Sequence, residues 1–223
     1  MRKVFNFDGP VFSFMSRLAD LAWLNIIYIV CCLPVVTIGA ATTALYYVTL
    51  KMAKDEDSYI TKSFFKSFKD NLKQATIIWI IFFIIIMISL MDFFVINGGD
   101  IAKIFNSDSI SNVMLFAIAM LGVIVVFTLT YVFPILAQFD NTVVNTIKNA
   151  FFISIRHLPY TVAMILINII PWVIMYLSAA TYVILLILFA TVAYINSKFF
   201  NKIFVRYMPK EVEEIIEPQE TID

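Results

Sequence analysis

The stretch CCLPVVTIGA, residues 31–40, interrupts an apolar run that is longer than a membrane span. Residues 21–50 around it carry no charged side chain, yet the stretch holds a proline, a threonine and a glycine close together. A helix rises about 1.5 Å per residue, so thirty residues would reach about 45 Å, while the hydrocarbon core of a bilayer is about 30 Å thick. One straight span over this run would therefore be too long.

The run is better explained by two short helices joined by a turn, over residues 13–33 and 38–52. Pro34 would end the first helix, because proline lacks the N–H that a helix interior needs, and Thr37 is well placed to cap the second. The alternative is one kinked span followed by a re-entrant or interfacial helix. The hairpin is the prediction that we carry forward.

Small residues follow the turn and indicate how the second helix packs. Gly39 and Thr43, and likewise Ala40 and Ala44, are spaced four apart. This spacing puts small side chains on one helix face and allows a neighbouring helix to approach closely. We therefore predict tight packing at the start of the second helix.

Composition places the chain among integral membrane proteins. Of its 223 residues, 61% are hydrophobic and 14% are charged, and the mean hydropathy is +0.90. Typical soluble domains carry about 25% charged residues. We predict an all-α, polytopic bundle of transmembrane helices that forms a single membrane domain over residues 1–210. The acidic segment 211–223 is expected to be a disordered tail.

Charge distribution predicts about six spans with both termini in the cytoplasm. Beyond the hairpin, apolar stretches cover residues 75–91 and 113–139, and residues 158–197 are long enough for two more spans. Basic residues gather in four segments: 2–17, 51–73, 148–156 and 198–210. With six spans, all four lie inside, as the positive-inside rule favours, and the acidic 92–111 loop lies outside. The alternative, five spans with a re-entrant segment, would place the basic N-terminus outside.

Two amphipathic segments are predicted to be elbow helices at the membrane surface. They share the pattern FFxS, an apolar residue and a base, and each precedes a span. Their aromatic side chains would enter the acyl boundary while the base reaches lipid phosphates. The echo is short enough to be chance; as a duplication it would imply parallel repeats. The elbow residues are Phe64, Phe65, Phe68 and Lys69, then Phe151, Phe152 and Arg156.

The sequence contains none of the motifs that we associate with catalysis. We predict no catalytic, cofactor-binding or metal-binding residues and no nucleic-acid partner, and we interpret His157 as an interfacial polar residue. Ionisable residues within spans usually mark ion coupling, and here only Arg17 and Asp20 qualify, at the start of the first span, where they could pair. The candidate intramembrane polar residues are Asn25 and Asn168, which we expect to hydrogen-bond between helices.

Three stretches of this chain resemble the YesL-like family of small bacterial membrane proteins. They are FNFDGPVFSFMSRLADL (residues 5–21), CCLPVVTIGAATTALYYVTLK (residues 31–51) and KSFFKSFKDNLKQA (residues 62–75). The family's DGP, LPxxTIGAxxTALYY and SFFKSFK patterns match in order and spacing over residues 5–80, and the resemblance beyond is mainly one of hydropathy. The family has no established mechanism, so no catalytic residue can be carried over.

The resemblance implies a location and a role. Members are often encoded beside carbohydrate ABC transporters and two-component sensors in Gram-positive bacteria. This implies a multi-pass protein of the bacterial cytoplasmic membrane that is accessory to sugar uptake or its sensing, with the bilayer and a sugar permease or sensor subunit as partners. Two alternatives remain open at this point: a small solute transporter in its own right, and a structural or lipid-organising membrane protein.

Overall fold

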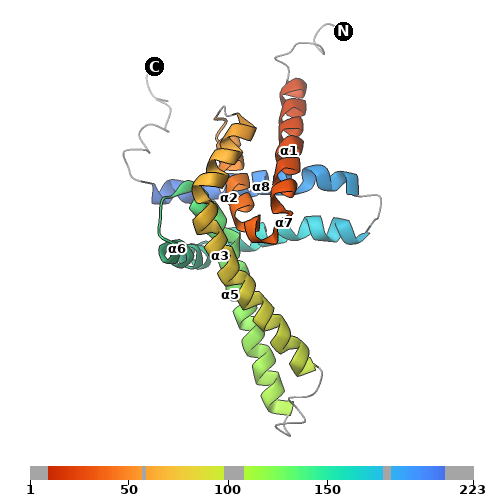
Figure 1. The fold of residues 1–223 in the computed structure, drawn as a ribbon, viewed down its shortest axis with the longest axis vertical. Helices are drawn as coiled ribbons and strands as arrows, with labels where there is room; N and C mark the ends of the chain where they lie inside the picture. The colour runs from red at the N-terminus through yellow and green to blue at the C-terminus, as the bar shows by residue number, and fades with distance from the viewer. Residues whose placement is uncertain (1–9, 57–58, 98–107, 178–181, 209–223) are drawn as a thin grey trace.

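The structure is a computed structural model that describes residues 10–56, 59–97, 108–177 and 182–208 (Figure 1). Every regular element among these residues is a helix, which confirms the predicted all-α class. The elements in chain order are α1 (Pro10–Cys32), η1 (Val35–Thr37), α2 (Ile38–Met52), α3 (Ile60–Asn97), α5 (Asp108–Gln138), α6 (Val143–Arg156), α7 (Leu158–Leu177), α8 (Tyr182–Phe204) and η3 (Val205–Tyr207). The expected tail, residues 211–223, lies outside the described residues. The first two residues of the DGP motif, 8 and 9, also lie outside them.

The apolar run does split into two helices, and α2 occupies the predicted residues 38–52. Pro34 has an extended backbone, and one turn of 3-10 helix follows it. The predicted capping role of Thr37 is wrong, because its side chain makes no cap hydrogen bond to α2. Its hydroxyl instead donates to the carbonyls of Cys31, at 2.7 Å, and Pro34, at 2.8 Å. The 3-10 turn places Thr37 next to the end of α1. The last carbonyls of a helix have no partner within the helix, so they accept hydrogen bonds from groups such as this hydroxyl.

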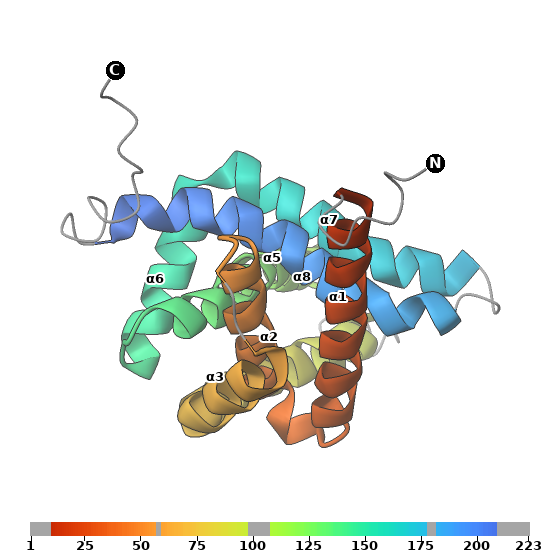
Figure 2. The same cartoon turned by 90° about the horizontal axis from the view of Figure 1, so that it is seen from above.

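Helix α2 is the centre of the fold. It contacts α1, α3, α5 and α8, and ten of its fifteen residues are buried. Its buried side chains are mostly small or β-branched, which lets four helices approach it. Figure 2 shows α2 surrounded in this way, with α7 and α8 lying side by side across the molecule.

Helix α3 corrects the prediction of a separate elbow before the third span. The charged segment from Ile60 and the apolar segment from Ala75 form one helix of 38 residues. The helix also continues past Asp92, where we expected the span to end, as far as Asn97. The change in composition near Gln74 marks a change of surroundings, and the backbone hydrogen bonding runs through it. Most of the expected 92–111 loop, residues 98–107, lies outside the described residues.

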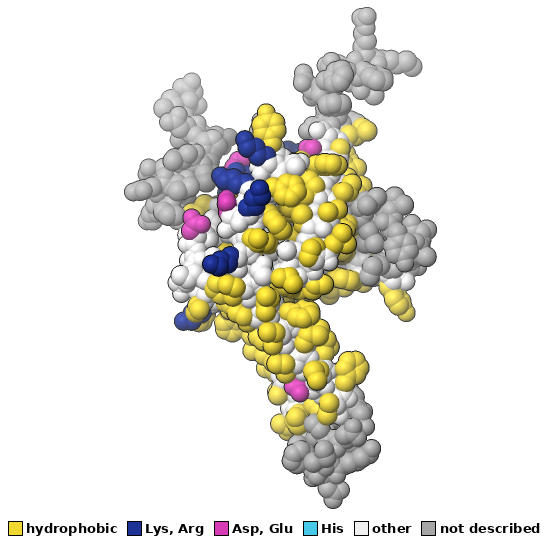
Figure 3. All heavy atoms as spheres, viewed as in Figure 1, with side chains coloured by type: hydrophobic (Ala, Val, Ile, Leu, Met, Phe, Trp, Pro, Cys, Tyr) yellow, Lys and Arg dark blue, Asp and Glu magenta, His cyan; other side chains and the backbone are white. Residues whose placement is uncertain are grey.

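The far half of α3 pairs with α5 in a hairpin that projects from the rest of the molecule (Figure 1). Its surface is almost entirely apolar, whereas lysines and arginines gather at the other end of α3 (Figure 3). An apolar pair of helices with lysines and arginines at one end is the arrangement expected of a membrane hairpin whose charged end lies at the membrane interface. One acidic side chain near the tip is the exception on the visible face.

The second predicted elbow is a distinct helix, α6. It turns by 103° into α7, and His157 lies at the corner. The two elbows therefore share a sequence pattern and differ in geometry: α3 runs straight into its span, whereas α6 bends sharply. The proposed duplication receives no support from this difference.

Four of the described helical segments are long and apolar enough to cross a membrane, or five if α6 and α7 count as one broken span. They are 14–32, 35–52, 60–96 and 111–138. The last predicted span, the second one within residues 158–197, corresponds to α8. The structure describes the backbone of this helix but not the side chains of its first residues. The chain is a membrane protein, and the count of six, the orientation and the single domain over 1–210 stay predictions.

Candidate functional site

A row of polar side chains lies where α8 meets α1, α2 and α7, and we call it the α8 seam. Its members are Asn25, Thr49, Asn168, Asn196, Ser197 and Asn201. Asn25, Thr49, Asn196 and Ser197 are buried, in helices that are otherwise apolar. Buried polar groups are costly unless they are hydrogen-bonded, so the partners of these side chains decide what the seam does.

Each neighbouring helix is joined to α8 through the seam. Asn196 Nδ2 donates to Asn168 Oδ1 on α7 at 2.8 Å, and the Thr49 and Ser197 hydroxyls lie 2.8 Å apart. Asn201 Nδ2 donates to the Leu50 carbonyl at 3.3 Å. These groups are carboxamides and hydroxyls that do not titrate near neutral pH. The seam is therefore suited to joining helices, and its chemistry does not suit a proton relay.

Asn25 makes an unusual contact, because its partner is the backbone of another helix. Its Oδ1 accepts from the Ala190 N–H at 2.9 Å, and the Asn25 side chain is fully buried. Residue 190 lies inside α8, where a backbone N–H ordinarily bonds within its own helix. The amide side chain of α1 thus fixes the position of α8 along its length.

The predicted polar residues lie apart. Asn25 contacts α8 and Asn168 contacts Asn196, at two different places on that helix. Thr43 is buried, and its hydroxyl donates to the Gly39 carbonyl within α2. Together with Thr37, which contacts the end of α1, these side chains serve separate packing contacts and line no shared cavity that the structure describes.

Gly39 lies at the closest approach of α2 to its neighbours. A Cβ built on it would lie 2.5 Å from the Ala75 carbonyl oxygen and 2.8 Å from Trp79 Cβ, both on α3. Contacts below 3 Å are not tolerated, so every other residue would force these helices apart. Ala40 is also fully buried. Gly39 thus faces α3 and α5, where side-chain volume is excluded.

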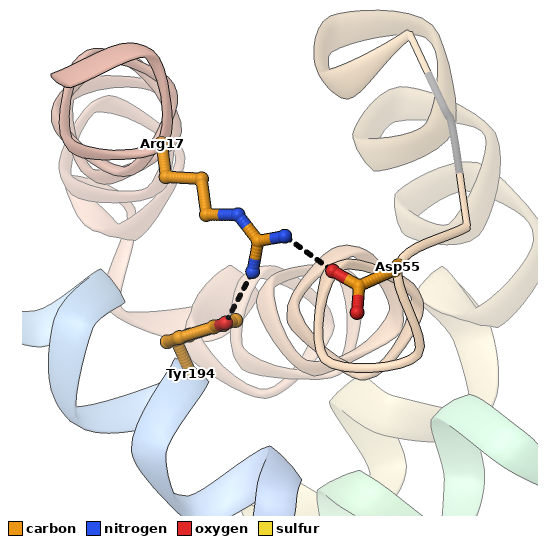
Figure 4. A network of polar contacts seen from close by, with 3 residues as sticks. All are labelled: Arg17, Asp55 and Tyr194. Carbon is orange, nitrogen blue, oxygen red and sulfur yellow. Dashed lines mark hydrogen bonds and ion pairs between the residues drawn. The ribbon is translucent and has the colours of Figure 1, made fainter. Parts of the chain in front are cut away.

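A second polar cluster lies at the charged end of the molecule (Figure 4). Arg17 on α1 forms an ion pair with Asp55, and its Nη1 donates to the Tyr194 hydroxyl on α8 at 2.9 Å. The expected pairing of Arg17 with Asp20 is replaced by this contact. Asp55 has a positive φ of 57°, which sharply turns the chain after α2. The Arg17 and Asp55 side chains are 45% and 71% exposed, so water screens the pair.

The elbow residues divide between core and surface. Phe64 is fully buried and stacks on Phe68 at 6.2 Å between ring centroids, whereas Phe65 is 40% exposed and Lys69 is exposed. On α6, Phe151 is partly buried, and Phe152 and Arg156 are exposed. In both elbows the first aromatic residue of the pair faces the protein more than the second does.

Three open grooves lie at the charged end. The first, of about 640 Å³, lies beside the Asn141 loop. The second, of about 760 Å³, runs along the lysines at the start of α3, and the third, of about 400 Å³, lies at the α6 corner. No group of three His, Cys, Asp or Glu side chains in the described part of the chain could hold a metal ion. The third groove combines an arginine with an apolar floor.

Sequence reasoning missed most of the seam. Thr49, Asn196, Ser197 and Asn201 were not singled out, and Asn201 lies beyond Lys198, which marked the end of the last apolar run. The helix continues to Phe204. The signal that could have found Asn196, Ser197 and Asn201 is their close spacing along one helix that continues beyond Lys198.

Comparisons with known proteins match the fold's central segment. Residues 21–93, which include α2, about half of α1 and most of α3, match the family described as "Protein of unknown function, DUF624". The chain is 26% identical over 161 residues to the uncharacterized protein YteU of Bacillus subtilis (strain 168), covering 70% of this chain and 69% of that protein. No solved structure matches the chain. The resemblance found in the sequence is confirmed by these matches: the chain is a membrane protein that is similar, over residues 21–93, to a family of unknown function.

Proposed function

We propose that the protein is a non-enzymatic accessory subunit of a carbohydrate uptake system or of its sensor, and that it binds the membrane helices of that partner through the α3–α5 hairpin. The observation that carries this proposal is the exposure of the hairpin. In each of these two helices, only 11% of the apolar 18-residue segment that could cross a membrane is buried inside the molecule. Seven of the exposed side chains are Ile84, Ile88, Phe94, Val113, Phe116, Met120 and Val123.

The outer face of α5 has a feature suited to a partner helix. Gly122 has open space where a side chain would be, with no atom within 4 Å of a Cβ built on it. Ala119, one turn earlier, is exposed. Without a hydrophobic driving force in lipid, helices associate through close backbone approach, which small residues permit. The hairpin therefore offers a notch at which a partner span can pack.

The carbohydrate part of the proposal is supported by the family resemblance and its genomic association. The matches themselves carry the description of unknown function, so identification of the partner is the decisive experiment. Flux by the purified protein alone would favour the transporter alternative.

The test is affinity purification of the full chain from native membranes, followed by mass spectrometry. We expect permease or sensor subunits to be recovered with the wild type, and about ten-fold less with Gly122→Leu. Met120→Leu is the matched control, because it conserves the volume of an exposed apolar side chain on the same helix and leaves the notch at Gly122 open. Equal recovery with both variants, or recovery of no membrane partner above a mock purification, would refute the proposal and leave lipid as the only occupant of the hairpin surface.

A further inference from the structure

The groove at the α6 corner is built differently from the other two. It lies where the end of α5, helix α6 and η3 meet, and has a volume of about 400 Å³. Its polar groups come from separate elements: Arg156 and Asn149 from α6, Asn141 from the loop before α6, and Tyr207 from η3. Phe139 and Phe152 supply apolar walls. A guanidinium, two carboxamides and a phenol thus face one space with an aromatic lining.

The tyrosine of the corner groove is held in place. His157 Nε2 lies 3.1 Å from the Tyr207 hydroxyl, and the His157 and Tyr207 rings meet edge to face with centroids 6.1 Å apart. The corner itself is fastened by Thr161, whose hydroxyl donates to the Ser154 carbonyl at 2.7 Å and lies 2.9 Å from the Tyr131 hydroxyl. A fixed framework of this kind lowers the entropic cost of ordering a binding site.

The charge at this corner is positive. Arg156 lines the groove, and Arg206 precedes Tyr207 in the chain; both lie close enough to His157 to lower its pKa, after burial as the larger cause. Neither arginine forms an ion pair with a carboxylate within the described ranges. Arginine presents a planar set of donors that matches phosphate oxygens, and carboxamide and phenol groups add neutral donors. The chemistry favours a phosphate-bearing anion.

We propose that the corner groove binds a phosphate ester, with Arg156 as the principal contact and Asn149 and Asn141 as further donors. Tyr207 adds its hydroxyl proton in the tautomer in which His157 Nε2 donates to that hydroxyl. The surroundings favour a phospholipid as the source. Phe152 is 65% exposed and Ile155 is 44% exposed on the outer side of α6, where acyl chains can lie against them. A free phosphate compound would use the same polar groups and leave Phe152 without a role.

The experiment uses the full-length protein, purified in detergent and titrated with phosphatidylglycerol, phosphatidylcholine or glycerol phosphate, with bound ligand measured by native mass spectrometry. We expect saturable binding of phosphatidylglycerol that falls about ten-fold in Arg156→Gln and is partly retained in Arg156→Lys. Lys148→Gln is the matched control, since Lys148 is exposed on the same helix and does not line the groove. Correct folding of each variant is checked by its elution volume and unfolding midpoint.

Phe152→Ala separates the two sources. Weaker binding of phosphatidylglycerol by Phe152→Ala than by the wild type assigns the site to lipid. Binding of phosphatidylglycerol that Phe152→Ala leaves unchanged, together with equally strong binding of glycerol phosphate by the wild type, assigns it to a soluble phosphate ester. Equal losses in Arg156→Gln and Lys148→Gln would show only diffuse surface charge and would overturn the proposal. Binding that Arg156→Gln leaves unchanged would also overturn it.

Discussion

Helix α2 and the α3–α5 hairpin are both apolar, and they do opposite things with that property. In the apolar 18-residue segment that contains α2, 56% of the residues are buried inside the protein. In the corresponding segment of each helix of the hairpin, only 11% are buried. The difference follows from side-chain size: α2 presents Gly39, Ala40 and Ala44 to its neighbours, whereas the hairpin presents large aliphatic and aromatic side chains. In a membrane protein, hydrophobicity alone therefore does not identify the core, and small residues do so better.

The largest effect is expected from filling the closest helix contact. Gly39→Leu would drive a side chain into the backbone of α3, since even a Cβ would lie 2.5 Å from the Ala75 carbonyl oxygen. We expect the variant to lose at least about 3 kcal/mol of stability, the upper range of overpacking, and to yield little monodisperse protein. Fluorescence-detected size-exclusion chromatography measures this. Gly122→Leu is the control, and an equal loss there would contradict the contrast between core and hairpin.

A phenylalanine pair on α3 tests the contrast within one helix. Phe64 is fully buried and Phe94 is 71% exposed. We expect Phe64→Ala to cost about 3–5 kcal/mol and Phe94→Ala no more than about 0.5 kcal/mol, because only the first leaves a cavity. Reversible unfolding in a detergent titration gives both values. Similar costs at the two positions would show that the hairpin surface is packed within a single copy of the chain.

The α8 seam predicts a smaller coupling. Asn168→Ala, Asn196→Ala and the double variant form a cycle around the 2.8 Å hydrogen bond between the two side chains. We expect a coupling energy of about 0.6–2 kcal/mol, the range for hydrogen bonds between membrane helices. Asn71→Ala, which removes a contact within α3 only, should show no coupling with Asn196→Ala. A coupling near zero for the first pair would remove the seam's structural role.

Acid should weaken the α6 corner and leave α2 untouched. Burial and the neighbouring Arg206 and Arg156 lower the pKa of His157, so the folded protein binds this proton less readily than the unfolded chain. The contribution is complete above the unfolded pKa of about 6.5 and is lost as the pH falls toward the lower folded value. His157→Gln should flatten this part of the stability profile between about pH 7 and pH 5. A wild-type profile that His157→Gln leaves unchanged would contradict the assignment.

The smallest effect is expected on the outer face of the hairpin. Gly122→Ala meets open space, so it should stabilise the isolated protein by at most about 1 kcal/mol, through helix propensity alone. The same unfolding titration measures it. Destabilisation of the isolated protein would show that α5 packs against another segment of this chain at that point.

The sequence predicts the break at Pro34 and both ends of α2, because bilayer thickness limits helix length and proline limits where a helix can continue. It does not reveal that α3 is one helix. The charged half and the apolar half indicate two different surroundings, while the helical backbone continues across the boundary between them. Thr37 was assigned by its position before α2, but its hydroxyl donates to the carbonyls of Cys31, in α1, and Pro34, in the turn.

The candidate sites were harder to predict than the helices. Arg17 pairs with Asp55, which is 38 residues away, in preference to Asp20 on its own helix. The partners of Asn25 and Asn168 lie on α8, at sequence separations of 165 and 28 residues. Side chains of this kind are recognisable as buried and polar from local sequence, but their partners are set by helix packing. The Arg156 groove likewise depends on η3 folding back to α6.

The continuity of α3 has a mechanical consequence. Thirty-eight residues make a rod about 57 Å long, and its sequence contains neither proline nor glycine at which it could flex easily. Its lysine-rich end and its apolar tip therefore belong to one continuous helix, so a tilt of either end would also displace the other.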